Sequence, residues 1–372
     1  MPSTTQTTPL YQYSQLTVDQ QNVIVGGGIL SGEIATFDGK HLPALEQRVA
    51  DLTGRAQALA VDSGSSALRL AMRGLGVGPG HEVIIPELGW VSIGAAADML
   101  GATVRVAPAT ETLTPTWEQI RPLITDATRA VVLVHLRGRP APGTGDIAAR
   151  LHERGIDLIE DCAQAWGVEV EGRPAGGWGT LATFSTHTFK LVATGEGGLI
   201  VGDNPDTMAL MRAIGGDTRQ PTPHAVWRSK ARMTELAAGL ALPQLDHLAA
   251  LVADLRALQQ QVLESLHDIG GITLVPASSA PVGNGSLVGL RLPDPAAAEQ
   301  LVGALFHGGY RSWWPGPGDL HTAAAWPVQP ERPLVDARRY LDVQIPWLPP
   351  DQHPTWAADL TRLIETTLAG AR

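Results

Sequence analysis

Cysteine and lysine are both scarce in this sequence. Among its 372 residues the only cysteine is Cys162. One cysteine cannot form an intramolecular disulfide bond or a metal site built from a cysteine cluster, and we expect no metal site. Of the 27 basic side chains, three are lysines: Lys40, Lys190 and Lys230. Any lysine chemistry must therefore use one of these three positions.

Long runs of one charge and long apolar runs are missing as well. The formal net charge of −10 is spread along the chain and offers no basic surface to nucleic acid. No apolar run reaches the roughly 18–20 residues that span a bilayer. The first residues, Met1–Leu16, lack the charged start and the apolar region of a signal peptide. We expect a cytoplasmic protein with no nucleic-acid or membrane partner.

Apolar residues make up 44% of the chain, which is enough for one large core and a smaller one. Between about residues 42 and 202, short apolar runs alternate with helical patterns. Helices are predicted at 42–53, 66–74 and 146–154. Seven runs are predicted strands: Ala58–Val61, Glu82–Ile85, Thr103–Val106, Ala130–Val134, Asp157–Ile159, Leu181–Phe184 and Gly198–Val201. Such alternation is typical of the α/β class, with a mostly parallel sheet covered on both faces.

The second half of the sequence has a different pattern. A long helix is predicted from about 233 to 266, with leucines at 245, 248, 251, 255 and 258. It is followed by predicted strands at 272–275 and 287–292 and helices at 295–307 and 351–369. These elements predict a smaller α+β domain. The predicted domains are an N-terminal arm (1–40), a large domain (41–245) and a small C-terminal domain (246–372).

A glycine-rich stretch, Val23–Gly32, mimics a dinucleotide-binding fingerprint. That fingerprint needs a helix that begins on the glycines. Here the sequence continues to Lys40 with a turn signal at Asp38-Gly39 and no helical pattern. Nucleotide binding at this stretch is therefore disfavoured.

Three polar motifs stand where predicted strands end. Asp62–Leu68 places small hydroxyl residues at a helix start, where backbone N–H groups suit a phosphate, although an ordinary serine N-cap has the same pattern. Ile159–Ala165 brings two carboxylates to a strand end, where open α/β sheets bind ligands and where a helix N-cap is the alternative. Thr183–Lys190 sets a lysine in an aromatic and hydroxyl-rich stretch. A desolvated lysine there becomes an imine-forming nucleophile, whereas a surface lysine would have no such role.

These stretches resemble the DegT/StrS family of sugar and cyclitol aminotransferases, within the aspartate aminotransferase superfamily of fold type I. The resemblance runs from about residue 42 to 250 and rests on six stretches: SGSSALRLAM, VIIPELGWVS, VHLRGRPAP, IEDCAQAWG, FSTHTFKLVATGEGG and RMTELAAGLALPQLDHL. It implies that the cofactor is pyridoxal 5'-phosphate (PLP). It also implies a large PLP-binding domain with a mixed, mostly parallel seven-stranded sheet flanked by helices, and a smaller C-terminal α+β domain.

The resemblance assigns roles residue by residue. Lys190 matches the lysine that carries PLP as a Schiff base. Asp161 matches the aspartate that keeps the pyridine nitrogen of PLP protonated, which lets the ring act as an electron sink. The other matched cofactor-binding positions are Ser65, Ser66 and Ser185 at the phosphate, Trp90 against the ring and Gln164 near the 3-hydroxyl.

Substrate-binding and intersubunit positions are matched less closely. His187, three residues before the lysine, is a candidate substrate-binding residue, whereas His135 is interpreted as structural. Arg232 matches an arginine near the partner's active site. Lys230 replaces a frequent asparagine that reaches the partner's phosphate. These two matches imply a homodimer with shared active sites.

Some positions depart from the family pattern. Ser65 and Thr188 replace a usual threonine and proline. The tryptophan-rich stretch from Trp313 to His321 offers aromatic surface and few cations. We include His321 among the substrate-binding candidates and interpret the stretch as favouring a compact ring over a nucleotide-linked sugar. The tryptophans could equally fill the core of the small domain.

The resemblance implies transfer of an amino group from glutamate or glutamine to a keto-sugar, keto-cyclitol or similar small ketone in secondary-metabolite (antibiotic) biosynthesis. An alternative within the family is dehydration or aromatisation of a cyclic substrate without net transamination. Dehydrating relatives carry histidine in place of the lysine, so Lys190 argues against that branch but not against aromatising synthases. A non-catalytic PLP-binding regulator is disfavoured by the complete set of Lys190, Asp161 and Gln164.

Overall fold

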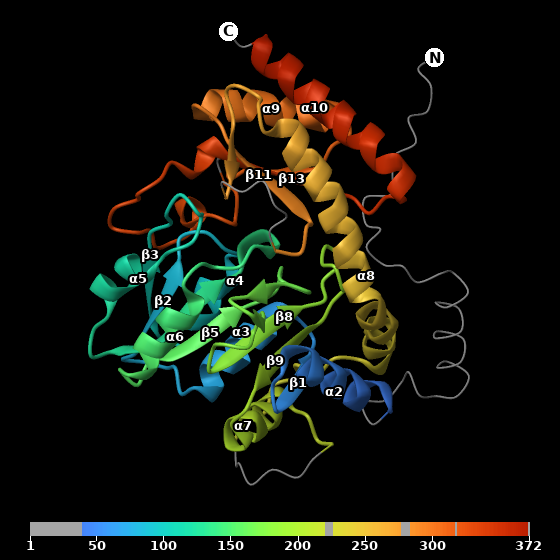
Figure 1. The fold of residues 1–372 in the computed structure, drawn as a ribbon. Helices are drawn as coiled ribbons and strands as arrows, with labels where there is room; N and C mark the ends of the chain where they lie inside the picture. Colours follow the sequence, from blue (N-terminus) through green and yellow to red (C-terminus); the bar gives the residue numbers. More distant parts are fainter. Residues whose placement is uncertain (1–38, 220–225, 277–282, 317, 371–372) are drawn as a thin grey trace. The chain divides into compact units, whose positions relative to one another are not determined.

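The computed structural model describes residues 39–219, 226–276, 283–316 and 318–370 (Figure 1). The glycine-rich stretch Val23–Gly32, and nearly all of the predicted arm, lie outside the described residues. The chain divides into two compact units. Among the described residues, the larger unit contains 39–249 and 318–335, and the smaller contains 250–316 and 336–370.

The larger unit is built on a seven-stranded sheet in the order β1-β9-β8-β5-β4-β2-β3 (Figure 1). Its strands are β1 (Gln57–Val61), β2 (Glu82–Pro86), β3 (Thr103–Ala107), β4 (Thr128–Val134), β5 (Asp157–Asp161), β8 (Leu181–Ser185) and β9 (Gly198–Gly202). The neighbouring strands from β8 to β3 are parallel, and β9 is antiparallel to both β1 and β8. The prediction of a mixed, mostly parallel seven-stranded sheet is confirmed. A separate hairpin pairs β6 (Glu169–Val170) with β7 (Arg173–Pro174).

Helices cover both faces of this sheet because successive strand residues alternate in direction. Ile84 of β2 packs in one core cluster with Ile147 and Leu151 of the helix Thr144–His152. The next strand residue, Ile85, points to the opposite face, where a Cβ placed on Gly94 of the helix Ser92–Asp98 would lie 3.3 Å from its side chain. The helices of the unit are α2 (His41–Thr53), α3 (Gly64–Gly74), α4 (Ser92–Asp98), α5 (Trp117–Ile120), α6 (Thr144–His152) and α7 (Pro205–Gly215). The sequence prediction missed α4, α5 and α7.

The smaller unit contains a four-stranded antiparallel sheet in the order β10-β11-β13-β12. Its elements are β10 (Thr273–Val275), β11 (Leu287–Arg291), α9 (Pro295–His307), β12 (Ser312–Trp313), β13 (Tyr340–Gln344) and α10 (His353–Ala369). Helix α9 packs against α10 and against β12 and β13. An α+β arrangement in the C-terminal part agrees with the pattern of the sequence.

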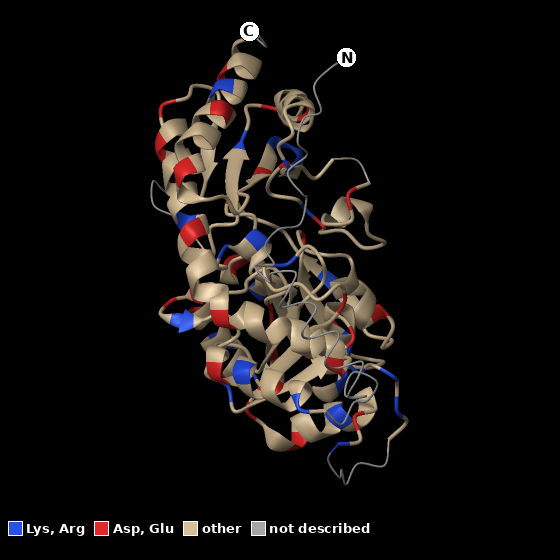
Figure 2. Cartoon of the chain, turned by 90° about the vertical axis from the view of Figure 1, so that its right-hand side faces the viewer, with Lys and Arg blue, Asp and Glu red and all other residues tan. Residues whose placement is uncertain are grey.

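Helix α8 (Glu235–Leu266) belongs to both units along its length. Its predicted leucines are buried, from Leu245 to Leu258. By length and composition α8 could cross a membrane, with a mean hydropathy of 1.4 over 18 residues, so the expectation of no such apolar stretch was wrong. Half of that window is buried inside the fold, which is how the core helix of a globular protein also behaves. Figure 2 shows acidic and basic residues interspersed along the helices in view.

Candidate active site

Four loops meet at the carboxyl edge of the parallel strands. Strands β2, β4, β5 and β8 are successive parallel neighbours. Trp90 follows β2, Arg137 follows β4, Asp161 ends β5 and Lys190 follows β8. Open α/β sheets bind ligands outside the carboxyl ends of their strands. The topology therefore brings these four side chains to one candidate site.

Lys190 lies on a tight turn after β8. Its N–H donates to the carbonyl of His187 at 2.9 Å, and the turn is closed by Thr186 N–H donating to Gly197 at 2.9 Å. A Cβ on Gly197 would collide with the Thr186 hydroxyl, so the chain needs glycine where it returns to the sheet. Burial lowers the pKa of Lys190 to about 8; the charge of Asp161 opposes this shift and that of Arg137 adds to it. A sizeable fraction of this amine is therefore neutral near pH 8, as a nucleophile requires.

Asp161 is only 4% exposed at the end of β5. Its Oδ1 accepts a hydrogen bond from Ala163 N–H at 2.9 Å. Burial raises the pKa of Asp161 against this hydrogen bond and the positive charge of Lys190. Opposite Asp161 in the sheet, the buried Thr183 hydroxyl has no hydrogen-bond partner among the described residues. A desolvated carboxylate of this kind suits a cationic partner such as a protonated ring nitrogen.

The predicted phosphate-binding residues gather at the start of α3. Ser63 caps the helix, its hydroxyl accepting from Ser66 N–H at 3.1 Å, and Ser65 is exposed in the first turn. A Cβ on Gly64 would lie 2.9 Å from Cβ of Ser185, so the helix start packs directly against the end of β8. First-turn N–H groups lack partners within a helix, and together with serine hydroxyls they suit a phosphate.

Trp90 pairs with His321 from a segment far along the sequence. Their ring centroids are 4.8 Å apart at 56°. Gly89 N–H donates to the His321 carbonyl at 3.0 Å, and Leu88 forms a β-bridge with Thr322. These backbone contacts explain why 318–335 belongs to the larger unit, although the predicted boundary puts it in the small domain. Trp90 is 43% exposed, which leaves indole surface for a ring to stack on.

His321 is held by Asp319. The Asp319 carboxylate accepts from the His321 backbone at 2.7 Å and pairs with Nδ1 at 2.8 Å. Burial lowers the pKa of His321, the bond to Asp319 opposes that shift, and the positive charges of Arg137 and Lys190 add to it. These charges place the histidine within electrostatic range of Lys190. Asp319 was not among the residues predicted from the sequence.

Gln164 fixes the loop after β4. Its Oε1 accepts a hydrogen bond from Arg137 N–H at 2.6 Å, so its NH₂ group is the part of the amide that can donate to another group. The 3-oxygen of PLP accepts hydrogen bonds, so a donor suits this position. Arg137 itself was missed by the sequence reading, because an arginine in a loop carries no pattern of its own.

A buried polar cluster beneath the site is already satisfied. Ala141 N–H donates to Nδ1 of His135 at 3.0 Å, so Nε2 carries the proton toward Glu160 at 2.9 Å. Glu160 also accepts from the backbone N–H groups of Gly176 and Trp178. With Cys162, these side chains lie close enough to hold a metal ion. Both histidine nitrogens are engaged, however, and the cluster is better explained as support for the loop after β7.

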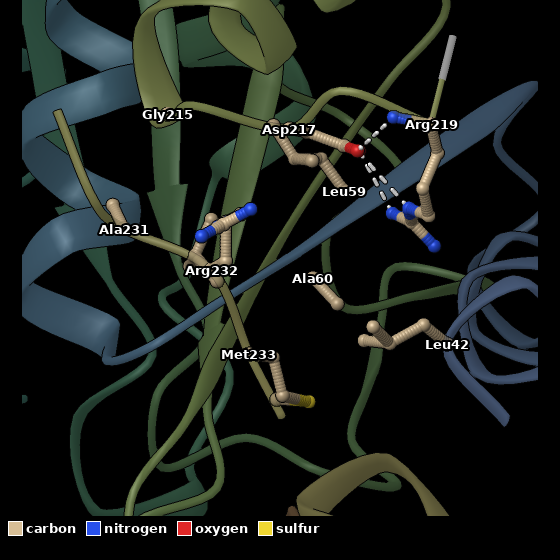
Figure 3. Close-up of a pocket in the computed structure, with 10 residues that line it drawn as sticks. Leu42, Leu59, Ala60, Gly215, Asp217, Arg219, Ala231, Arg232 and Met233 are labelled. Carbon is tan, nitrogen blue, oxygen red and sulfur yellow. Dashed lines mark hydrogen bonds and ion pairs between the residues drawn. The ribbon is translucent and has the colours of Figure 1, made fainter. Parts of the chain in front are cut away.

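The side chains of three predicted residues have no described contact with the Lys190 side chain, although the backbone carbonyl of His187 accepts from Lys190 N–H. His187 stacks on Phe189 with centroids 4.9 Å apart and lies 3.7 Å from Glu196. Lys230 is exposed. Arg232 lines a small hollow beside the Asp217–Arg219 ion pair (Figure 3). The described contacts thus bring most of the predicted cofactor residues and His321 together, whereas the roles of His187, Lys230 and Arg232 stay predictions.

The assembled residues satisfy what PLP needs. They provide hydroxyls and a helix start for the phosphate, a buried carboxylate for the ring nitrogen, an exposed indole for the ring face and an amine with a lowered pKa for the aldehyde. The buried Thr183 hydroxyl beside Asp161 is a further polar group at the same place. The donor set therefore suits the group implied by the sequence.

The lowered pKa of Lys190 predicts a pH profile for cofactor incorporation. Only the neutral amine attacks an aldehyde, and its fraction rises with pH through about 8 rather than through the ordinary 10.5. The rate at which the PLP-free protein takes up PLP should therefore rise with pH to a midpoint near 8 and then level off. Stopped-flow absorbance measures this rate. A rate still climbing steeply above pH 9 would contradict the assignment of a desolvated Lys190.

Comparisons with known proteins show the family and the fold. Residues 23–304 match the DegT/DnrJ/EryC1/StrS aminotransferase family. DesV from S. venezuelae is 28% identical over 93% of this chain and 95% of its own, with a TM-score of 0.82. An aminotransferase from Psychrobacter cryohalolentis (22% identity, 97% and 99% covered, TM-score 0.84) has the same fold. So does 3-amino-5-hydroxybenzoic acid synthase (23%, 97% and 99%, TM-score 0.82).

Proposed function

The chain belongs to the DegT/DnrJ/EryC1/StrS aminotransferase family, whose members use PLP, and from this premise we propose its reaction and its site residues. The enzyme moves an amino group from glutamate or glutamine to a keto-sugar, keto-cyclitol or similar small ketone, in cytoplasmic secondary metabolism. The observation that carries the proposal is the placement of two groups after neighbouring strands. Lys190, whose pKa is lowered to about 8, follows β8, and the buried Asp161 ends β5.

Each residue of the site has one task in this proposal. Ser65, Ser66 and Ser185 bind the phosphate, and Trp90 stacks on the ring. PLP supplies an electron sink for the carbanion and carries the nitrogen between donor and acceptor. Asp161 keeps the proton on the ring nitrogen, and Gln164 donates to the 3-oxygen.

Lys190 binds the aldehyde carbon of the cofactor and later acts as an acid and base. When it is free, its amine would remove the proton from the donor's α-carbon and hold that proton for return within the site. Trp90 and His321 flank the space in which the substrate binds.

We propose a homodimer with shared active sites. Lys230 and Arg232 match intersubunit positions in the family resemblance, and neither contacts Lys190 of its own chain among the described contacts. A closed, isologous pair is the commonest arrangement for such a protein. In it, Lys230 would reach the phosphate, and Arg232 the substrate, of the partner's site.

Absorbance spectra during titration with glutamate and glutamine test the proposed function. The bound cofactor should convert from its aldehyde form to its amine form with one of these donors, and an added keto-cyclitol or keto-sugar should reverse the conversion. We expect compact rings to be better acceptors, by kcat/KM, than nucleotide-linked keto-sugars. A cofactor that binds but is not converted by any amino acid would favour the alternative of an aromatising or dehydrating enzyme.

A further inference from the structure

Arg137 occupies a strained position in the candidate site. Its backbone has φ 57° and ψ 34°, in the left-handed region that non-glycine residues usually avoid. The turn is held by the 2.6 Å hydrogen bond from Arg137 N–H to Gln164. Gly138 follows at φ 73°. Strain of this kind persists at functional sites, where the side chain has a use that outweighs it.

The side chain of Arg137 is partly buried and lies within electrostatic range of the reactive lysine. Its Nε and Nη2 atoms are buried. The charge of Arg137 contributes to lowering the pKa of Lys190, of His321 and of Asp319, so all three lie within its electrostatic range. Two cations, Arg137 and Lys190, thus share one small region.

Two described acidic groups of that region, Asp319 and Asp161, have other roles in the site. Asp319 is bonded to His321 through both its backbone and its ring. Asp161 lies at the end of β5, where the ring nitrogen of the cofactor is expected. A substrate carboxylate would bring negative charge to Arg137, whose planar fork binds carboxylates through two parallel hydrogen bonds.

We propose that Arg137 binds the α-carboxylate of the amino donor. This carboxylate is attached to the carbon from which Lys190 removes the proton, so it must lie close to Lys190 during the reaction. Arg137 is the cation that the loop after β4 holds within range of that lysine. The inference rests on the proposed function, and it makes Arg137 a specificity-determining residue.

The test uses equilibrium binding rather than turnover. α-Methylglutamate carries the α-carboxylate but no α-hydrogen, so it can bind to the holoenzyme without reacting further, and the cofactor absorbance reports its Kd. Arg137→Leu should weaken this binding roughly ten- to hundred-fold, the effect of losing hydrogen bonds to a charged group. Arg137→Lys should recover part of the loss.

Matched controls separate recognition from folding. Arg137→Gly accepts the left-handed backbone without strain and should show the same loss as Arg137→Leu. Arg150→Leu removes an equal charge from the exposed surface of α6 and should leave the Kd unchanged. 4-Aminobutyrate lacks an α-carboxylate, and its binding should not respond to Arg137→Leu.

Three outcomes would overturn the inference. They are an unchanged Kd for α-methylglutamate in Arg137→Gly, an equal loss for 4-aminobutyrate, and a defect confined to the acceptor half-reaction, which would assign the carboxylate to the acceptor. Failure of the wild-type protein to bind PLP at all would instead count against the proposed function. Absorbance of bound PLP in each variant distinguishes the two failures.

Discussion

Lys190→Ala is expected to abolish turnover while leaving the fold intact. The variant loses the amine that binds the cofactor aldehyde and the group that moves the proton at the donor's α-carbon. Loss of a general acid–base group alone costs about 10²–10⁴-fold in rate. Removing a buried amine whose pKa is already lowered by desolvation should not reduce the free energy of unfolding of the PLP-free protein. kcat from an amino-transfer assay and thermal unfolding measure the two effects.

Two controls identify the lysine. Borohydride reduction of the wild-type holoenzyme followed by peptide mapping should place the pyridoxyl group on Lys190, and Lys40→Ala should retain normal kcat. Added methylamine should restore part of the activity of Lys190→Ala, because it supplies an amine of similar chemistry. A label on Lys40 or Lys230 would rule out the assignment.

The same variant tests the shared active site. Lys190→Ala and Arg232→Ala should each be inactive alone. After subunit exchange, a mixed dimer contains one site with both residues intact, so part of the activity should return. If mass measurements demonstrate subunit exchange and no activity returns, Lys190 and Arg232 belong to the site of a single subunit.

Asp161→Asn is expected to lose about 10²–10³-fold in kcat. A neutral amide does not hold the proton on the ring nitrogen, and removing one preorganised electrostatic partner from a buried site has effects of this size. Near-normal turnover with PLP bound would show that Asp161 is structural.

The stability of the PLP-free Asp161→Asn protein should not fall, although its kcat does. Burial raises the pKa of Asp161 above its unfolded value, so the folded state binds this proton more tightly than the unfolded chain does. Stability therefore falls as pH rises from the unfolded pKa through the folded one, and at neutral pH the ionised carboxylate is a cost to the PLP-free protein. Asp161→Asn should then unfold at an equal or higher temperature without PLP, and gain less from PLP than the wild type. Calorimetry with and without PLP measures both differences; a large loss of stability without PLP would contradict this account.

Much of the larger unit could be predicted from the sequence. Strands such as Ala130–Val134 and Leu181–Phe184 are short apolar runs. A strand that is buried on both faces of a sheet needs such a run, so the local sequence alone indicates it. Helix α4 was missed for a local reason as well. It is seven residues long and rich in alanine, so it has little amphipathic pattern.

The reactive pair was visible in the sequence for a related reason. Lysine is scarce and Lys190 stands in a distinctive stretch, while Asp161 ends an apolar run. Strand-end positions follow from local periodicity, and the order of parallel strands then brings such ends together.

Only the tertiary structure decided which distant groups share the site. His321 and Asp319 join Trp90 through backbone hydrogen bonds between segments more than two hundred residues apart. Arg137 lies within electrostatic range of Lys190 because the strands that precede them, β4 and β8, flank β5 in the sheet. The strain at Arg137, the lowered pKa of Lys190 and the raised pKa of Asp161 likewise arise from packing. Periodicity is encoded between near neighbours in the sequence, whereas burial and charge proximity depend on every element that packs around a group, and no local pattern specifies them.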